Sequence, residues 1–235
     1  YDSLPPVEPS DLVAAFDETG WYVIRDNWTP ASNFVLVDCG EHGFMNGGHA
    51  HADALSFVLS VNGEPVFVDS GTFTYTADPA ARDYFRSTSA HNCLTVAGES
   101  SSVPNGPFSW ASKARSRVLE WKTDAGETVL RAAHDGFERF GVGYEREFRV
   151  TPSGMLLVDK IAARSARDFE LSFIMAPSTE ARAVGGGRIE IVSKDGKRPL
   201  LTIVTKLIGE VPGASGEWRI EHAEISPRYG QKVPT

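Results

Sequence analysis

Histidine is concentrated in one part of this 235-residue chain, because four of its six histidines are His42, His49, His51 and His91. Polar and apolar residues alternate over residues 49–59, so we predict a β-strand on which His49 and His51 share one face. Positions two apart on a strand are about 6.5–7 Å from each other, which lets two imidazoles contact one ion or one substrate. Ordinary hydrogen-bonded histidines also occur at this spacing, so the pair alone leaves both interpretations open.

A carboxylate and a further histidine strengthen the metal interpretation. Asn62-Gly63 is a tight-turn signal, so the strand after it is expected to fold back and bring Asp69 close to the two histidines. His91 lies just ahead of another predicted strand. Two histidines and one carboxylate are a common zinc set, with the remaining position held by water or a fourth ligand. Asp53 is the alternative to Asp69 as the carboxylate ligand.

The elements that must position these residues are predicted to be mainly strands. Short apolar runs rich in Val, Ile, Phe and Thr, such as 21–25 and 34–38, are separated by turn signals at spacings near 8–12 residues. Helical periodicity is predicted only for short stretches, 9–15 and 79–85. We therefore expect an all-β fold, an antiparallel β-sandwich with few short helices.

Composition excludes several classes of protein. The chain has 23 Lys+Arg against 31 Asp+Glu, a net charge of −8, which argues against a general nucleic-acid binder. No apolar run approaches the roughly 18–20 residues of a membrane span. Two cysteines, Cys39 and Cys93, are too few for a disulfide framework, although one bridge between them stays open.

Three segments carry a family resemblance. They are His49-Ala-His-Ala-Asp-Ala-Leu-Ser-Phe57, Val68-Asp-Ser-Gly-Thr-Phe-Thr-Tyr75, and the run from Arg82 to Asn92 that contains Ser-Ala-His-Asn. Together they resemble the heparinase II/III-like domain of polysaccharide lyases, a family that includes heparinases II and III and several alginate lyases. The resemblance implies a supersandwich-like β-sandwich.

The resemblance also assigns roles to individual residues. It implies a divalent metal, zinc in particular, held by His51, Asp69 and His91, in agreement with the spacing argument. It implies that His49 faces the substrate cleft and assists catalysis. Tyr75 and Arg86 fall in a segment that lines the cleft in the family and are its candidate substrate-binding residues, with a core aromatic and a surface ion pair as the alternatives.

The activity implied is β-elimination on a uronic-acid polysaccharide such as a glycosaminoglycan or alginate. Family enzymes place a helical α/α-toroid before this domain, and the toroid supplies a catalytic tyrosine and the group that neutralises the uronate carboxylate. We therefore expect residues 1–17 to be a linker or short helix from a preceding toroid and residues 18–235 to be the sandwich. The chain alone is expected to lack activity, and the enzyme is expected to be periplasmic or extracellular.

Two other functions compete with this one. A cupin-like metalloenzyme also carries His-X-His on a β-strand, but Ser56 stands where the cupin glutamate ligand would be. A non-catalytic carbohydrate-binding or structural module would use the metal only to hold strands together. Among the other histidines, His134 is expected to be a hydrogen-bonded sheet residue, and His42 and His222 are expected on the surface. A basic patch that attracts a uronate chain is expected from Arg82, Arg86, Lys113 and Arg115.

Overall fold

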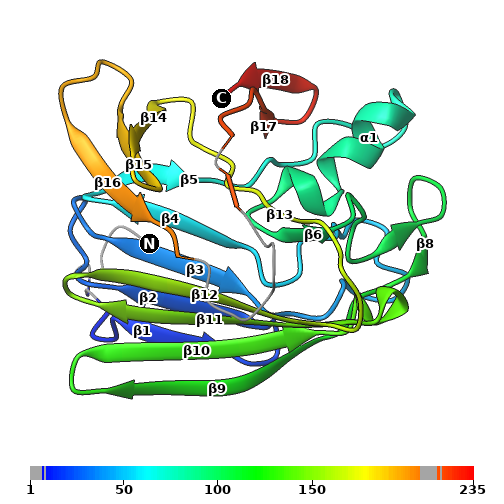
Figure 1. Cartoon of the computed structure of the whole chain (residues 1–235), viewed down its shortest axis with the longest axis horizontal. Helices are drawn as coiled ribbons and strands as arrows, with labels where there is room; N and C mark the ends of the chain where they lie inside the picture. The colour runs from blue at the N-terminus through cyan, green and yellow to red at the C-terminus, as the bar shows by residue number, and fades with distance from the viewer. Residues whose placement is uncertain (1–6, 8, 207–215, 218) are drawn as a thin grey trace.

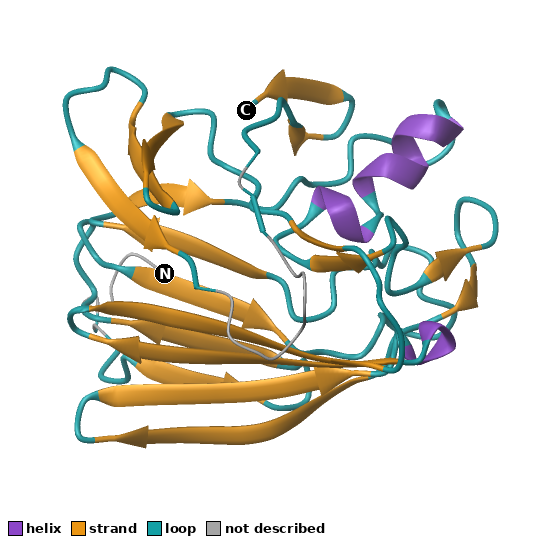
Figure 2. Cartoon of the chain, viewed as in Figure 1, coloured by secondary structure: helices purple, strands orange, loops and turns teal. Residues whose placement is uncertain are grey.

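Two antiparallel sheets form the body of the molecule in a computed structural model that describes all residues except 1–6, 8, 207–215 and 218 (Figures 1 and 2). Strands hold 46% of the residues and helices 6%, which confirms the predicted all-β sandwich. The first sheet contains, in spatial order, β1 (Val13–Phe16), β2 (Trp21–Arg25), β3 (Phe34–Asp38), β4 (Phe57–Val61) and β5 (Glu64–Phe67). The second contains β12 (Gly154–Ala163), β11 (Val142–Thr151), β10 (Glu127–His134) and β9 (Ser116–Asp124).

The core lies between these two sheets, where inward-facing apolar side chains of each meet. Phe57 of β4 and Phe148 of β11 are both buried, and their ring centroids are 5.5 Å apart at an interplanar angle of 73°. Val37 and Leu130 are completely buried in the same cluster. Alternate residues of these strands face the core, as expected for sheets with one buried face.

The hairpin between β4 and β5 is the one that the Asn62-Gly63 turn predicts. Val61 pairs with Glu64, and both turn residues have positive φ, 51° and 79°, as a type I′ turn requires. A Cβ at Gly63 would lie 1.9 Å from the Pro30 carbonyl oxygen, so only glycine fits there. The turn thus sets the direction in which the chain returns toward Asp69.

Smaller elements gather above and beside the sandwich. The helix α1 (Pro79–Phe85) has the predicted bounds, and the Asp78 carboxylate caps it by accepting a hydrogen bond from the Ala81 N–H at 3.0 Å. The remaining strands form small sheets: β6 (Leu94–Val96) with β13 (Phe169–Leu171), β7 (Val103–Pro104) with β8 (Trp110–Ser112), β14 (Thr179–Gly185) with β15 (Arg188–Ser193) and β16 (Pro199–Val204), and β17 (Glu224–Arg228) with β18 (Gln231–Pro234). Two short 3₁₀ helices, η1 (Thr88–Ala90) and η2 (Glu138–Phe140), complete the described structure.

The predicted helix over residues 9–15 is wrong. Val13–Phe16 form β1, which pairs antiparallel with β2, so the first sheet begins at Val13. A helix of only about two turns is marginal by itself, and strand pairing along β2 outweighs it. Residues 1–6 and 8 of the predicted linker lie outside the described part of the chain. Within the described residues, no helix has both the length and the apolar character that crossing a membrane requires.

The predicted strand over residues 49–59 is only partly present. β4 begins at Phe57, and the residues from His49 to Ser56 form turns and irregular backbone. Leu55 has a φ of 64°, and the Ser56 N–H donates to the Asp53 carbonyl at 2.8 Å. The strand alternation that was to place His49 and His51 on one face is therefore absent.

Candidate metal centre

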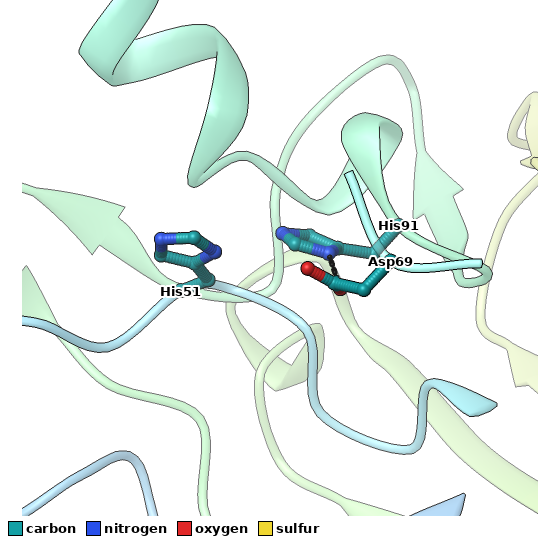
Figure 3. Close-up of side chains that lie close together, drawn as sticks. All are labelled: His51, Asp69 and His91. Carbon is teal, nitrogen blue, oxygen red and sulfur yellow. Dashed lines mark hydrogen bonds and ion pairs between the residues drawn. The ribbon is translucent and has the colours of Figure 1, made fainter. Parts of the chain in front are cut away.

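Three separate segments of the chain bring the predicted ligands together. His51 lies in the loop before β4, Asp69 follows β5, and His91 follows η1. Their ligand atoms all lie within 4.8 Å of one another, and Figure 3 shows the three side chains gathered at one point. Asp53, the alternative carboxylate, is not part of this group. The hairpin return of Asp69 thus occurs as predicted, although His51 is not on a strand.

His91 is the most constrained member of the group. Its side chain is completely buried, and its Nδ1 donates a hydrogen bond to Asp69 Oδ2 at 2.7 Å. The other oxygen of Asp69 accepts from the Gly71 N–H at 2.8 Å. A carboxylate that accepts from one ring nitrogen fixes the tautomer and orients the other nitrogen, an arrangement common behind zinc-binding histidines.

The second nitrogen of His91 is the observation that fits a metal. His91 Nε2 is buried and has no hydrogen-bond partner among the described residues. Buried polar atoms of this kind are rare, so an unpartnered one calls for a ligand. The His51 ring stands beside it, with a centroid separation of 5.2 Å. Two imidazoles and a carboxylate are donors that zinc prefers, so the residues present fit such an ion.

The charges of the group favour different protonation states for the two histidines. Burial, together with the charge of His91, lowers the pKa of His51 to about 3, so its ring is neutral at pH 7. Burial acts to lower the pKa of His91 as well, but the carboxylate of Asp69 raises it to about 9. A bound cation would therefore displace a proton from His91, and its affinity would fall with acidity.

Arg82 of α1 anchors the loop that bears His51. Its side chain is buried, and its Nη1 donates to His51 Nε2 at 3.3 Å. The same guanidinium donates to the Gly48 carbonyl at 3.2 Å and to the Pro107 carbonyl at 3.3 Å. The helix thus helps to fix the position of the His51 ring.

Arg86, the predicted substrate-binding arginine, is also buried. Its guanidinium pairs with Asp83 and donates to the Gly106 carbonyl at 2.9 Å. The structure therefore places it beneath the surface, between α1 and the 105–107 turn. The prediction of a surface basic patch is wrong for Arg82 and Arg86, because both side chains are buried. The Arg82 guanidinium donates to His51 and to two carbonyls, and the Arg86 guanidinium pairs with Asp83 and donates to one carbonyl.

Asn92 ties the His91 segment to the rest of the site. The Asn92 amide donates to the Phe57 carbonyl at 2.7 Å and to the Val68 carbonyl at 3.0 Å. Its Oδ1 accepts from the Ile174 N–H at 2.6 Å. One buried amide therefore connects the chain next to His91 with β4 and with the residue before Asp69.

Arg146 of β11 holds the same loops from the opposite sheet, and sequence analysis missed it. Its completely buried Nη1 donates to the Leu55 carbonyl at 3.0 Å and to the Asn92 carbonyl at 2.7 Å. Nε and Nη2 pair with Asp159, which also accepts from the Tyr144 hydroxyl at 2.6 Å. The available signal was an arginine at a core-facing position of a strand, between Tyr144 and Phe148.

His49 lies beside the group on an exposed part of the loop. Its ring meets the edge of Tyr75 at a centroid separation of 5.0 Å and an angle of 90°. His49, His51, Asp53 and Asp38 line one cavity of about 260 Å³. Burial and the neighbouring Asp53 raise the pKa of Asp38 to about 6. The cavity therefore brings the exposed histidine, the candidate ligand and three acids, Asp38, Glu41 and Asp53, together.

The remaining histidines and cysteines have simpler environments. His134 is buried in β10 and accepts from the Gly136 N–H at 3.1 Å, as predicted for a sheet histidine. The prediction that His42 lies on the surface is wrong, because its ring is packed edge-on against Trp110 and its Nε2 is buried. Cys39 and Cys93 are both buried and free, so they form no bridge.

A family profile described as "Heparinase II/III-like, C-terminal" matches residues 8–235. The chain belongs to the heparinase II/III-like C-terminal family. The cupin alternative is therefore wrong. A heparin-sulfate lyase of Bacteroides thetaiotaomicron is 26% identical over 185 residues, covering 75% of this chain and 24% of that protein. Another, of Bacteroides stercoris, is 30% identical over 91 residues, covering 37% of this chain and 13% of that protein.

Solved structures share the fold. Heparan sulfate lyase HepC from Pedobacter heparinus superposes with a TM-score of 0.80 at 18% identity, covering 99% of this chain and 34% of that one. A heparinase III structure gives a TM-score of 0.74 at 19% identity, covering 96% of this chain and 33% of that one. The chain thus spans about a quarter of the first relative and a third of these structures.

Proposed function

We propose that this chain is the metal-binding β-sandwich domain of a polysaccharide lyase that cleaves a uronic-acid polysaccharide by β-elimination, and that it supplies part of the active site. The observation that carries the proposal is the convergence of His51, Asp69 and His91, with an unpartnered buried nitrogen on His91. Family membership and relatives named heparin-sulfate lyases support it. Such an enzyme would act in the periplasm or outside the cell, where these polymers occur.

The proposed metal is zinc, held by His51, Asp69 and His91. When bound, zinc would tie together three segments that share no strand, and in doing so would stabilise the loop beside the cavity. As a ligand, Asp69 would give the ion the carboxylate oxygen that now accepts the hydrogen bond from His91 Nδ1. Arg82, Asn92 and Arg146 would hold the ligand segments in position.

His49 is the proposed catalytic residue of this chain. In β-elimination the proton on C5 of the uronate leaves, the C4–O bond breaks, a C4–C5 double bond forms and the departing oxygen takes up a proton. An exposed imidazole next to the cavity can contact the uronate carboxylate or the departing oxygen. One imidazole cannot neutralise the carboxylate, remove the proton and protonate the oxygen, so the other groups would come from a helical toroid elsewhere in the whole enzyme.

Two measurements test the proposal. Elemental analysis of protein purified without chelator should find about one zinc per chain, and His51→Ala should lose it. The whole enzyme should release unsaturated uronate from at least one of heparan sulfate, heparin and alginate, whereas the 235-residue chain alone should not. Equal metal content in wild type and His51→Ala would contradict the metal assignment, and enzymatic turnover by the chain alone would contradict the shared active site.

A further inference from the structure

An aromatic cluster adjoins His49 on the side away from the core. Its centre is Tyr75, whose ring is 5.7 Å from the ring of Phe108 and 5.7 Å from the ring of Tyr229. The guanidinium of Arg82 lies 5.0 Å from the same ring, and His49 meets its edge. Because Tyr75 is surrounded by four groups, little of its own face is free to receive a ligand.

Tyr229 is the exposed end of this cluster. It is 65% exposed and its ring is nearly parallel to that of Tyr75, with an interplanar angle of 29°. An aromatic side chain that is stacked on one side and open on the other presents a flat apolar face to solvent. The open face of Tyr229 is the one turned away from Tyr75, and Tyr75 stands between Tyr229 and His49, so a polymer that contacts His49 can reach that face by extending past Tyr75.

The C-terminal hairpin holds Tyr229 at a fixed place relative to the candidate metal centre. Tyr229 sits in the turn between β17 and β18. The Ser226 N–H donates to the Ser70 carbonyl and the Gly230 N–H donates to the Phe73 carbonyl, each at 2.7 Å. Both acceptors belong to the segment that directly follows Asp69. The hairpin is therefore attached to the site itself, as its place above β5 in Figure 1 indicates.

A pyranose ring is the chemistry that suits this surface. One face of such a ring carries C–H groups that pack on an aromatic face, while its hydroxyl and carboxylate groups stay in water. Arg228, next to Tyr229, is exposed and has no ion-pair partner among the described residues, which gives the hairpin tip a positive charge. An acidic sugar therefore matches both the flat apolar ring and the charge beside it.

We propose that Tyr229, supported by Tyr75, is a stacking subsite for a sugar ring of the polysaccharide, farther along the polymer than the sugar that contacts His49. This inference rests on the proposed function, and it assigns a substrate-binding residue to the C-terminal hairpin. A group that contacts a neighbouring sugar stabilises the ground state and the transition state equally, so it lowers KM and leaves kcat unchanged.

The test uses the whole enzyme and three variants. Tyr229→Ala should raise KM about tenfold and leave kcat within about twofold, while Tyr229→Phe should behave as wild type because the ring and not the hydroxyl makes the contact. Trp28→Ala, at an exposed aromatic in the loop between β2 and β3, is the matched control and should leave KM unchanged. Zinc content should be the same in all four proteins.

Binding is measured separately from turnover, so that this inference and the proposed function can fail independently. The probe is whichever of heparan sulfate, heparin and alginate most retards the wild-type protein in affinity gels. Tyr229→Ala should lose most of that retardation even if no polymer is cleaved. If Tyr229→Ala leaves both the retardation and KM unchanged, the subsite is overturned. A fall in kcat together with loss of zinc in Tyr229→Ala would overturn it as well, and so would a wild-type protein that none of the polymers retards.

Discussion

The buried guanidinium of Arg146 allows the contribution of one side chain to be worked out from its contacts. Arg146→Met removes every donor of a completely buried group and leaves Asp159, whose side chain is only 13% exposed, without its ion-pair partner. Breaking a buried pair in this way costs about 3–5 kcal/mol of folding free energy. For a chain of this length the melting temperature should then fall by about 10 °C.

The double variant Arg146→Met/Asp159→Leu separates stability from positioning. Replacing both members of a buried ion pair by apolar residues is often close to neutral, so part of the lost melting temperature should return, although the buried Tyr144 hydroxyl loses its acceptor. The carbonyls of Leu55 and Asn92 still lack the donor that holds them, however, so zinc affinity should remain below that of wild type by at least about tenfold.

Calorimetry of the chain and titration with zinc measure these two quantities. Arg131→Met on β10 is the control, because Arg131 is partly exposed and its carboxylate partners lie at 3.7 and 3.9 Å, so it should cost less than about 1 kcal/mol. If the double variant binds zinc as tightly as wild type, Arg146 only stabilises the sandwich. If Arg146→Met loses less than about 1 kcal/mol of folding free energy, the predicted cost of about 3–5 kcal/mol is refuted.

Three further outcomes are expected. His51→Ala should lose zinc and lower the melting temperature together; a variant that keeps its metal would contradict ligation. His49→Ala in the whole enzyme should lower the rate about 10²–10⁴-fold and keep its zinc, and near-full turnover would refute a catalytic role. Burial lowers the pKa of His134 to about 4 in the folded chain, whereas it stays near 6.5 in the unfolded chain. As the pH falls below about 6.5, the unfolded chain therefore binds a proton that the folded chain does not, and the folded state loses stability. About 3 kcal/mol of stability should be lost by pH 4, and His134→Asn should flatten this slope while the same change at the exposed His222 should not.

Local signals account for the parts of the fold that the sequence predicts correctly. β2, β3 and α1 have the predicted bounds, because alternating apolar residues, a capping aspartate and a proline at the first helical position act within a few residues of one another. The Asn62-Gly63 turn is equally local. Its hairpin brings Asp69 back toward His51, so this pair could be predicted from the local sequence, whereas the choice of Asp69 over Asp53 and the addition of His91 came from the family resemblance.

The errors arise where distant contacts decide the backbone. Residues 49–56 alternate as a strand would, yet they form a loop because its end is held from two sides. The Leu55 N–H donates to the Asp38 carbonyl at 2.9 Å, and the Leu55 carbonyl accepts from Arg146, which is 91 residues away. No local pattern contains that contact. The same holds for Tyr229, whose ring reaches Tyr75 only after the C-terminal hairpin has attached beside Asp69.

Buried polar groups hold the loops that carry the candidate ligands in place. A non-glycine residue at positive φ, such as Leu55, costs of order 1 kcal/mol or more, so the loop does not keep its shape unaided. The hydrogen bonds from Arg146 and Asn92 offset that cost only while the two sheets stay packed, because Arg146 belongs to the second sheet and the loop that contains Leu55 connects β3 and β4 of the first. In the proposed metal site, zinc affinity would therefore depend on sandwich packing, and changes that loosen the core between the sheets should weaken zinc binding before they unfold the chain.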